Sequence, residues 1–148
     1  GKMHKKYLAV LCGKPVDNNG TYVDYLKQDK KNNCSRIVDK SDPESKRAEL
    51  EYKVLDCIQT EEKDPQYLSL VEIKLLTGRH HQIRVQFSGH GTPLYGDGKY
   101  GNNEKAVRKS LALCACHLKF KHPATGKIMD FQIKPDTGAF KLFSKSND

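Results

Sequence analysis

Two neighbouring stretches of alternating apolar and polar residues constrain the fold of this chain more than any other feature. Residues 48–60 read AELEYKVLDCIQT, and residues 67–76 read YLSLVEIKLL. In the first stretch, Leu50, Tyr52 and Val54 alternate with polar side chains. A period of two places such side chains on one face of a β-strand. The two stretches, separated by EEKDPQ with its strand-breaking proline, are predicted to form an antiparallel hairpin.

Several other segments also favour strands. The strand-like pieces are residues 4–13, 35–39, 111–123 and 127–135. Asn18-Asn19-Gly20 is predicted to form a turn between two strand-like pieces. The polar, charged residues 27–47 are expected to form an exposed excursion that contains the short strand. Pro123-Ala124-Thr125-Gly126 is predicted to turn the chain between the last two pieces.

The period changes after Thr77, because Ile83 and Phe87 are four residues apart, as on one face of a helix. A short helix is predicted over residues 80–88, with Thr77 as its N-cap and Gly89 and Gly91 ending it. Two more helices are predicted over residues 103–111 and 138–146. Runs of strands with a few short helices between them indicate an α+β fold with a mainly antiparallel mixed sheet.

Composition narrows the class of partner. The chain has 148 residues, enough for one domain or part of one, and a formal net charge of +8. Such a basic net charge favours nucleic acid as the partner. A membrane surface is the weaker candidate, because the sequence contains no amphipathic basic helix long enough to bind one. The five cysteines are odd in number and irregularly spaced, and no signal peptide is visible, so reduced thiols and a cytoplasmic location are expected. The oligomeric state stays open.

The densest polar cluster is residues 75–101, LLTGRHHQIRVQFSGHGTPLYGDGKYG. Arg79 and Arg84 are five residues apart, so on a helix they point to different faces. Arginine holds a phosphate or a carboxylate through two parallel hydrogen bonds, and a helix N-terminus favours anions. Arg79 is therefore predicted to hold an RNA backbone and Arg84 to orient a carboxylate. The alternative is a surface helix with two solvated arginines.

A metal site is the weaker interpretation of this cluster. His80, His81 and His90 lie in it, and CACH follows at residues 114–117. Zinc sites favour a C-x-x-C pair or histidines four apart on a helix, and neither spacing is present. No metal is therefore predicted. A zinc-dependent module stays an alternative that metal analysis of the purified protein would test.

Residues 75–101 closely resemble the block T-G-R-x-H-Q-I-R-V-x-x-x-x-x-G-x-P-x-x-G-D-x-x-Y-G of the RluA family of RNA pseudouridine synthases. The flanks agree: KKYLAVLCGK is similar to K-x-Y-x-A-x-V-x-G, and SKRAELEYKVL is similar to K-x-A-x-T-x-Y-x-V-L. LALCACHLKFKHP is similar to L-x-L-H-A-x-x-L-x-F-x-H-P. The resemblance covers almost the whole chain in order.

The resemblance implies an enzyme that converts uridine to pseudouridine in RNA without a cofactor, after flipping the base from its stack. It implies that Tyr7 stacks on the flipped uracil and that Arg84 pairs with the catalytic aspartate. Arg79, His81 and Lys99 are assigned to RNA contact, with Arg79 and His81 also candidates for loop structure. Ribosomal RNA is the expected substrate, with transfer RNA second.

Asp97 also matches the motif and is interpreted as a carboxylate that orders its own loop. Three positions depart from the family pattern, which leaves the details of RNA contact open: His80 replaces a small hydroxyl residue, and Gln86 and Cys114 each replace a histidine.

The family's catalytic aspartate lies in an H-R-L-D motif before the K-x-Y strand, and no H-R-x-D occurs in this sequence. Residues 1–148 are therefore expected to be part of a pseudouridine synthase domain that lacks the segment carrying that aspartate and is inactive alone. The alternative is a non-catalytic RNA-binding module of the same fold.

Overall fold

The computed structural model describes residues 4–61, 63–101, 110–132, 135 and 138–144. Seven strands form one sheet in the order β3-β2-β4-β5-β1-β6-β7, and each described pair of neighbours is antiparallel. In chain order the strands are β1 (His4–Cys12), β2 (Asn19–Asp29), β3 (Cys34–Val38), β4 (Lys46–Gln59), β5 (Tyr67–Leu75), β6 (Leu113–Lys121) and β7 (Ile128–Gln132). The α+β class with a mainly antiparallel sheet is confirmed.

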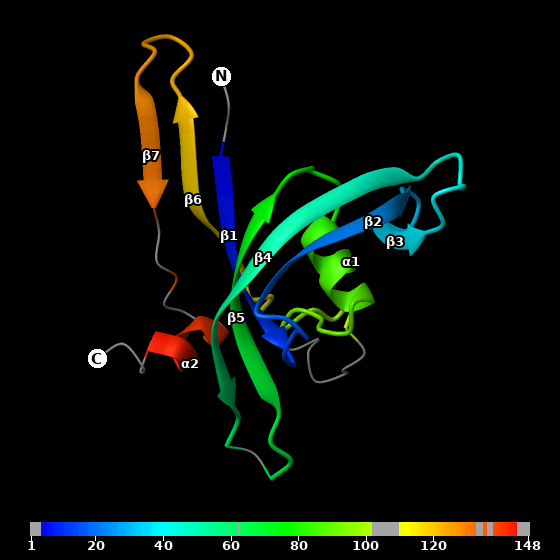
Figure 1. The fold of residues 1–148 in the computed structure, drawn as a ribbon, viewed down its shortest axis with the longest axis vertical. Coiled ribbons are helices and arrows are strands. Elements are labelled where there is room, and N and C mark those ends of the chain that lie inside the picture. Colours follow the sequence, from blue (N-terminus) through cyan, green and yellow to red (C-terminus); the bar gives the residue numbers. More distant parts are fainter. Residues whose placement is uncertain (1–3, 62, 102–109, 133–134, 136–137, 145–148) are drawn as a thin grey trace.

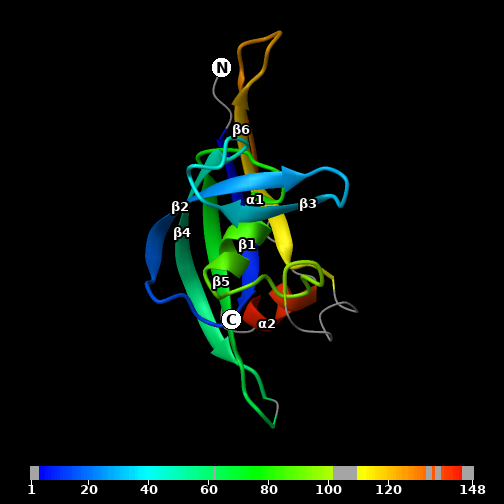
Figure 2. The same ribbon diagram turned by 90° about the vertical axis from the view of Figure 1, so that its right-hand side faces the viewer.

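Three short helical segments lie against this sheet: α1 (Gln82–Gly89), the 3-10 turn η2 (Gly138–Phe140) and α2 (Lys141–Ser144). The strands β2 and β4 sweep away from the rest of the sheet, and α1 lies beneath that sweep (Figure 1). The view turned by 90° shows α1 in front of the central strands and α2 below α1, above the tip of the β4–β5 hairpin (Figure 2). None of the described helices is long and apolar enough to cross a membrane.

Strand β1, which lies between β5 and β6, contributes side chains to two hydrophobic cores on opposite faces of the sheet. Ala9 and Leu11 belong to the core that includes Ile83 and Phe87 of α1, whereas Val10 belongs to the core beneath η2 and α2. This alternation follows from the period of two in a strand, which sends successive side chains to opposite faces. The sheet is thus buried on both faces around β1.

The predicted hairpin of residues 48–60 and 67–76 is confirmed as β4 and β5, with a register shift between Val54 and Asp56. The turn predicted at Asn18-Asn19-Gly20 is wrong, because Asn19 and Gly20 are the first residues of β2. That strand pairs with β4 and β3 rather than with β1. Its neighbours are distant in sequence, so a local turn signal does not describe its start.

The excursion of residues 27–47 is more ordered than its composition predicted. β2 continues to Asp29, β3 occupies Cys34–Val38, and β4 begins at Lys46. α1 approaches β3 closely at Gly89, where an added Cβ would lie 2.3 Å from Cδ1 of Ile37. The excursion is therefore docked on α1 at this point.

The helix predictions have mixed outcomes. The helix predicted over residues 80–88 is confirmed as α1, shifted slightly towards the C terminus. The helix predicted over residues 103–111 falls mostly outside the described residues. The C-terminal helix predicted over residues 138–146 is seen as η2 and α2 as far as residue 144.

Candidate active site

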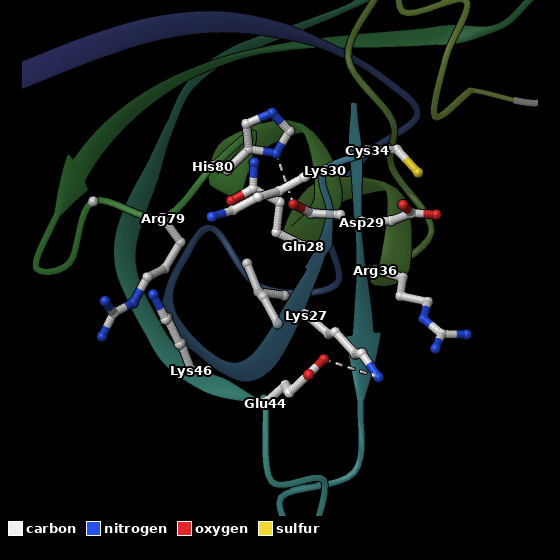
Figure 3. A pocket seen from close by; sticks show the side chains of 13 residues that line it. Lys27, Gln28, Asp29, Lys30, Cys34, Arg36, Glu44, Lys46, Arg79 and His80 are labelled. Atoms are coloured by element: carbon white, nitrogen blue, oxygen red, sulfur yellow. Dashed lines mark hydrogen bonds and ion pairs between the residues drawn. The ribbon is translucent and has the colours of Figure 1, made fainter. Parts of the chain in front are cut away.

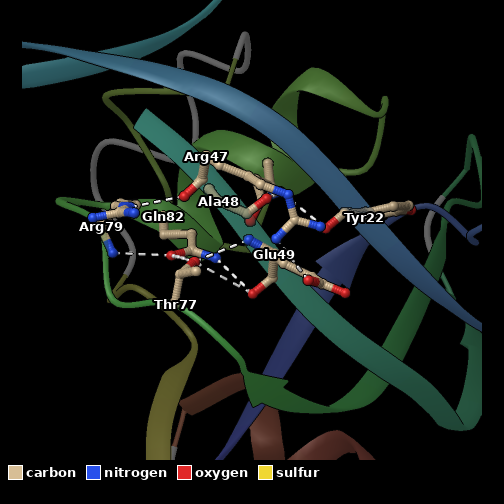
Figure 4. A network of polar contacts seen from close by, with 8 residues as sticks. Tyr22, Arg47, Ala48, Glu49, Thr77, Arg79 and Gln82 are labelled. Carbon is tan, nitrogen blue, oxygen red and sulfur yellow. Dashed lines mark hydrogen bonds and ion pairs between the residues drawn. The ribbon is translucent and has the colours of Figure 1, made fainter. Parts of the chain in front are cut away.

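The entry into α1 is fixed by a polar network on β4 (Figure 4). The Thr77 hydroxyl accepts a hydrogen bond from the backbone N–H of Glu49 (2.9 Å), and the Gln82 side chain donates to the Glu49 carbonyl (3.1 Å). The other end of the Gln82 amide accepts from the backbone N–H of Arg79 (2.9 Å). The prediction of Thr77 as N-cap is therefore wrong, because its hydroxyl binds the neighbouring strand instead.

The residue that precedes the helix is His81, in the left-handed conformation with φ 52°. That conformation is costly for a residue other than glycine and persists where surrounding contacts hold it. The ring supplies one such contact, because Nδ1 of His81 lies 2.6 Å from the Tyr100 hydroxyl. Burial, and then electrostatic interactions with His80, Arg84 and Lys99, lower the pKa of His81. The imidazole is therefore neutral at pH 7.

Arg84 and Asp97 form a bidentate ion pair at the centre of the cluster. Nε of Arg84 lies 3.0 Å from Oδ2 of Asp97, and Nη2 lies 2.9 Å from Oδ1. The Asp97 side chain is 0% exposed and that of Arg84 is 20% exposed. Two parallel charge-assisted bonds fix both distance and orientation. Arg84, on α1, is thereby locked to the glycine-rich loop that follows the helix.

Asp97 also orders its own loop, as predicted. Its Oδ1 accepts hydrogen bonds from the backbone N–H groups of Lys99 (3.1 Å) and Tyr100 (3.0 Å). Burial alone would raise the pKa of Asp97, but the hydrogen bond from Arg84 and these N–H donors outweigh it and hold the pKa below the usual value. The carboxylate is ionised, and Arg84 is its counter-ion.

Tyr100 joins this pair to strand β3. The guanidinium carbon of Arg84 lies 5.0 Å from the centre of the Tyr100 ring, a cation–π distance. The Tyr100 hydroxyl accepts a hydrogen bond from the backbone N–H of Ser35 (3.0 Å). The Ser35 hydroxyl lies 2.8 Å from Nδ1 of His80. Arg84, Tyr100 and the start of β3 therefore form one connected unit.

The structure places Tyr7 and Arg84 on elements that share a core. Tyr7 lies on β1 opposite Ile73 and Ala115, at a register shift in the pairing with β6. Its half-buried ring packs against the core that holds Ile83, the neighbour of Arg84 on α1. Tyr7 is thus on the α1 face of the sheet. Its role as an active-site tyrosine stays a prediction.

The three residues assigned to RNA contact occupy different surroundings. Arg79 is exposed and anchored, because its Nε donates to the carbonyl of Arg47 (2.8 Å). Lys99 is exposed, and its ammonium donates to the carbonyl of Asn33. His81 is half-buried beneath Tyr100. The assignment to RNA stays a prediction for all three, and Lys99 and His81 also have a structural role.

Sequence reasoning missed a second polar network, centred on Gln86. This side chain is 0% exposed, and its Nε2 donates to Oδ2 of Asp24 (2.9 Å) and to the carbonyl of Ala48 (3.3 Å). His90 contacts the same Asp24 oxygen at 2.9 Å and stacks on Tyr22 at 3.8 Å. The sequence feature that pointed to this network was Gln86, which stands where the family pattern has a histidine. The network ties the C-terminal half of α1 to β2 and β4.

The cysteines and histidines do not assemble into a metal site in the part of the chain that the structure describes. Cys114 packs on the core beneath α2, and Sγ of Cys116 donates to the carbonyl of Lys6 at 3.4 Å. His117, the last residue of CACH, instead pairs with Asp130 at 2.7 Å. The first two are contacts of packed side chains, and the third is a side-chain hydrogen bond between β6 and β7.

The amino-acid sequence of this chain matches one family of known proteins. A family model described as RNA pseudouridylate synthase matches residues 1–89. The chain is 37% identical over 128 residues to the uncharacterized RNA pseudouridine synthase YlyB of Bacillus subtilis, covering 86% of this chain and 39% of the relative. It is 34% identical to the ribosomal large subunit pseudouridine synthase D of Zymomonas mobilis, covering 89% of this chain and 41% of the relative.

Solved structures show the same fold. Human RNA pseudouridylate synthase domain containing 1 superposes with a TM-score of 0.75 at 22% identity, covering 98% of this chain and 66% of the human chain. Human RNA pseudouridylate synthase domain containing 4 superposes with a TM-score of 0.71 at 23% identity, covering 95% of this chain and 61% of the human chain. The chain spans about 40% of the length of the curated relatives it matches.

Proposed function

Because the chain belongs to the RNA pseudouridylate synthase family, as the resemblance to the RluA group predicted, we propose that it forms part of the active site of an enzyme that isomerises uridine to pseudouridine in RNA. In this reaction the bond from N1 of uracil to C1′ of ribose breaks and a bond from C5 to C1′ forms. C5 loses a proton and N1 gains one. The chemistry is redox-neutral and needs base flipping.

The observation that carries the proposal is the way Arg84 is held. The described bonds from Arg84 to Asp97 use two of the five N–H donors of the guanidinium, so further donors remain for a second carboxylate. Asp97 and the Tyr100 ring fix the plane of the guanidinium. Arg84 is thus a preorganised cation on the face of the sheet that also carries Tyr7. This arrangement supports positioning of a catalytic aspartate.

The aspartate itself belongs to the proposal. The buried, ionised Asp97 has its oxygens occupied by Arg84 and the backbone, which suits a structural carboxylate better than a nucleophile. The catalytic carboxylate is therefore assigned to the H-R-L-D segment that the family resemblance implies, outside residues 1–148. Tyr7 is assigned to stacking on the flipped base.

Ribosomal RNA is the proposed substrate, because relatives are named ribosomal large subunit pseudouridine synthases. Transfer RNA is the second candidate, and a cytoplasmic location forms part of the same proposal. The net charge of +8 supports a polyanionic partner. A non-catalytic RNA-binding module of the same fold is the alternative function, since it would use the same charge.

Tritium release from ribosomal RNA labelled with [5-³H]uridine tests the proposal, because loss of the C5 proton is part of the reaction. This chain is compared with a longer form that carries the H-R-L-D segment. Release from the longer form alone is the expected result. If residues 1–148, without the added segment, also release tritium, the catalytic carboxylate lies within residues 1–148. Binding of RNA with no release from either form would establish the binding module instead.

A further inference from the structure

A broad pocket lies between the β2–β3 hairpin and the segment that leads into α1. Its volume is about 890 Å³. The charged residues that line it are Lys27, Asp29, Lys30, Arg36, Glu44, Lys46 and Arg79. Figure 3 shows Arg79 and Lys46 extending together on one side of the pocket, with His80 at its end. Most of these residues belong to the excursion that composition alone marked as exposed and polar.

The charges of this pocket are unevenly compensated. Lys27 pairs with Asp42 at 3.6 Å and with Glu44 at 3.4 Å, and Figure 3 shows it turned towards Glu44. Asp29 accepts hydrogen bonds from the side chain and backbone of Asn32 (2.7 and 3.3 Å). Glu44 is thus paired with Lys27, whereas Asp29 is held by the neutral Asn32 and is also attracted by Arg36.

Four cations remain, namely Lys30, Arg36, Lys46 and Arg79. Within the described residues none of them forms an ion pair. Arg79 is also anchored at Nε by the Arg47 carbonyl, which leaves both terminal nitrogens of its fork for an anion. Like charges at close range repel one another. A pocket with this composition therefore favours binding of a polyanion, which neutralises several of the cations together.

The pocket is poor in surfaces on which a base could stack. Among the lining residues His80 has the one ring, and its two nitrogens contact Ser35 (2.8 Å) and Asn33 (3.1 Å). Proteins that bind bases of single-stranded RNA place aromatic side chains along the groove. A lining of flexible lysines and arginines contacts phosphates and carries no sequence information. The chemistry fits a sugar–phosphate backbone.

The pocket is connected to the candidate active site. Ser35 and His80 line the pocket, and the N–H of Ser35 donates to the hydroxyl of Tyr100, whose ring stacks on Arg84. One shared wall therefore separates the pocket from the Arg84–Asp97 pair. A chain that presents one nucleotide near Arg84 has its neighbouring phosphates within reach of this wall.

We propose that this pocket binds the RNA sugar–phosphate backbone beside the target uridine and does so independently of base sequence. The proposal rests on the proposed function for the identity of the polyanion. It assigns Lys30, Arg36 and Lys46 to phosphate contact, in addition to Arg79. It also gives the β2–β3 hairpin a role in positioning the substrate.

The test measures fluorescence anisotropy of labelled single-stranded RNA on this chain, with two unrelated oligonucleotides of equal length. The triple variant Lys30→Gln, Arg36→Gln, Lys46→Gln is compared with the control Lys119→Gln, Lys121→Gln, Lys127→Gln. The control removes the same charge from the β6–β7 hairpin at the other edge of the sheet. Affinity is measured between about 50 and about 200 mM salt, where phosphate contacts are resolved.

The pocket variant is expected to bind both RNAs about tenfold or more weakly, and its salt slope is expected to fall by about 2, roughly 0.7 for each contact to a single strand. The control is expected to change either quantity far less. Equal losses in both variants would overturn the pocket and leave the proposed enzyme intact, since tritium release tests that separately. A loss confined to one RNA sequence, or equal displacement by polyglutamate, would also overturn it. Unchanged circular dichroism shows that both variants fold.

Discussion

Both faces of the sheet bury apolar side chains, but they differ in what else they bury. Towards α1, Ala9 and Leu11 pack with Phe87, and towards α2, Val10 packs with Phe140 and Phe143. Of the buried polar side chains, Gln82, Gln86, Thr92 and Asp97 lie at α1 or in the loop after it, whereas Ser35 lies on β3 and Ser69 on β5. The core beneath α2 consists of apolar residues.

This difference separates a face held by specific polar contacts from a face held by apolar packing. Burying a polar group costs free energy unless hydrogen bonds replace its lost water. Most of the buried polar groups at α1 have hydrogen-bond partners, whereas Oε1 of Gln86 and Oγ1 of Thr92 have none among the described residues. A face needed only for stability is more simply made from apolar residues, as the α2 face is. The polar face is therefore where a specific geometry is maintained.

The largest effect is expected from removing Asp97. Asp97→Ala leaves the mostly buried Arg84 cation and the N–H groups of Lys99 and Tyr100 without their partner, so the free energy of unfolding should fall by about 3 kcal/mol. Urea unfolding measures this loss. The matched control is Asp130→Ala, whose carboxylate is 44% exposed in its pair with His117 and should cost at most about 0.5 kcal/mol. Similar losses in both variants would mean that the α1 face does not depend on its buried pair.

On the opposite face, Phe143→Ala should lower the free energy of unfolding by about 3 kcal/mol, because it opens a cavity in the apolar core. Its neighbour Leu142 is 44% exposed, so Leu142→Ala should cost less than about 0.5 kcal/mol. RNA affinity, measured by anisotropy below the unfolding transition, should be unchanged in both. Weaker RNA binding by folded Phe143→Ala would break the division between the two faces.

The sequence predicted those parts of the fold that depend on local periodicity. The alternation around Leu50 and Leu70 predicted β4 and β5, and the spacing of Ile83 and Phe87 predicted α1. β2 was harder to predict because its partners are β3 and β4, and its end at Lys27–Asp29 is polar on both faces. A strand with little apolar alternation forms because of the strands it pairs with, so its own sequence does not predict it.

The site shows the same limit. The motif marked Arg84 and Asp97 separately, but their ion pair depends on how the loop after α1 folds back over thirteen residues. Thr77 was a good N-cap by residue type, and the nearby N–H of Glu49 took its hydroxyl instead. The pocket beside β2 and β3 could not be predicted from the sequence, because its cations come from β2 and its turn, β3, β4 and the segment before α1, and meet only in the fold. Tertiary contacts decide such cases and local propensity does not.

Arg84→Lys tests whether geometry or charge matters on the α1 face. An ammonium keeps the charge but cannot hold both oxygens of Asp97, so stability should fall by about 1–2 kcal/mol. In the longer form with the H-R-L-D segment, tritium release should fall far more than RNA affinity. The control Arg47→Lys alters a half-exposed pair with Glu49 and should change stability by less than about 0.5 kcal/mol. Normal release from Arg84→Lys would remove Arg84 from the active site.

The smallest effect is expected at His81 and concerns pH. The folded-state pKa of His81 lies below its ordinary value of 6.5, so the unfolded chain takes up a proton first as the pH falls. The stability from neutral His81 is therefore complete above pH 6.5 and declines as the pH falls towards the folded-state pKa. The Tyr100 hydroxyl accepts from the N–H of Ser35, and its own hydrogen is available to donate to Nδ1 of a neutral His81 ring.

His81→Asn removes this titration while keeping a residue type that tolerates positive φ. Urea unfolding between about pH 7.5 and about pH 5.5 should then show a shallower loss of stability than in the unchanged chain. The carboxylate of Asp97 does not confound the comparison, because its pKa lies below the ordinary value of 3.8 and it stays ionised throughout that range. An unchanged slope in His81→Asn would show that the histidine beneath Tyr100 contributes packing alone, and that the polar character of the α1 face rests on Asp97, Gln82 and Gln86.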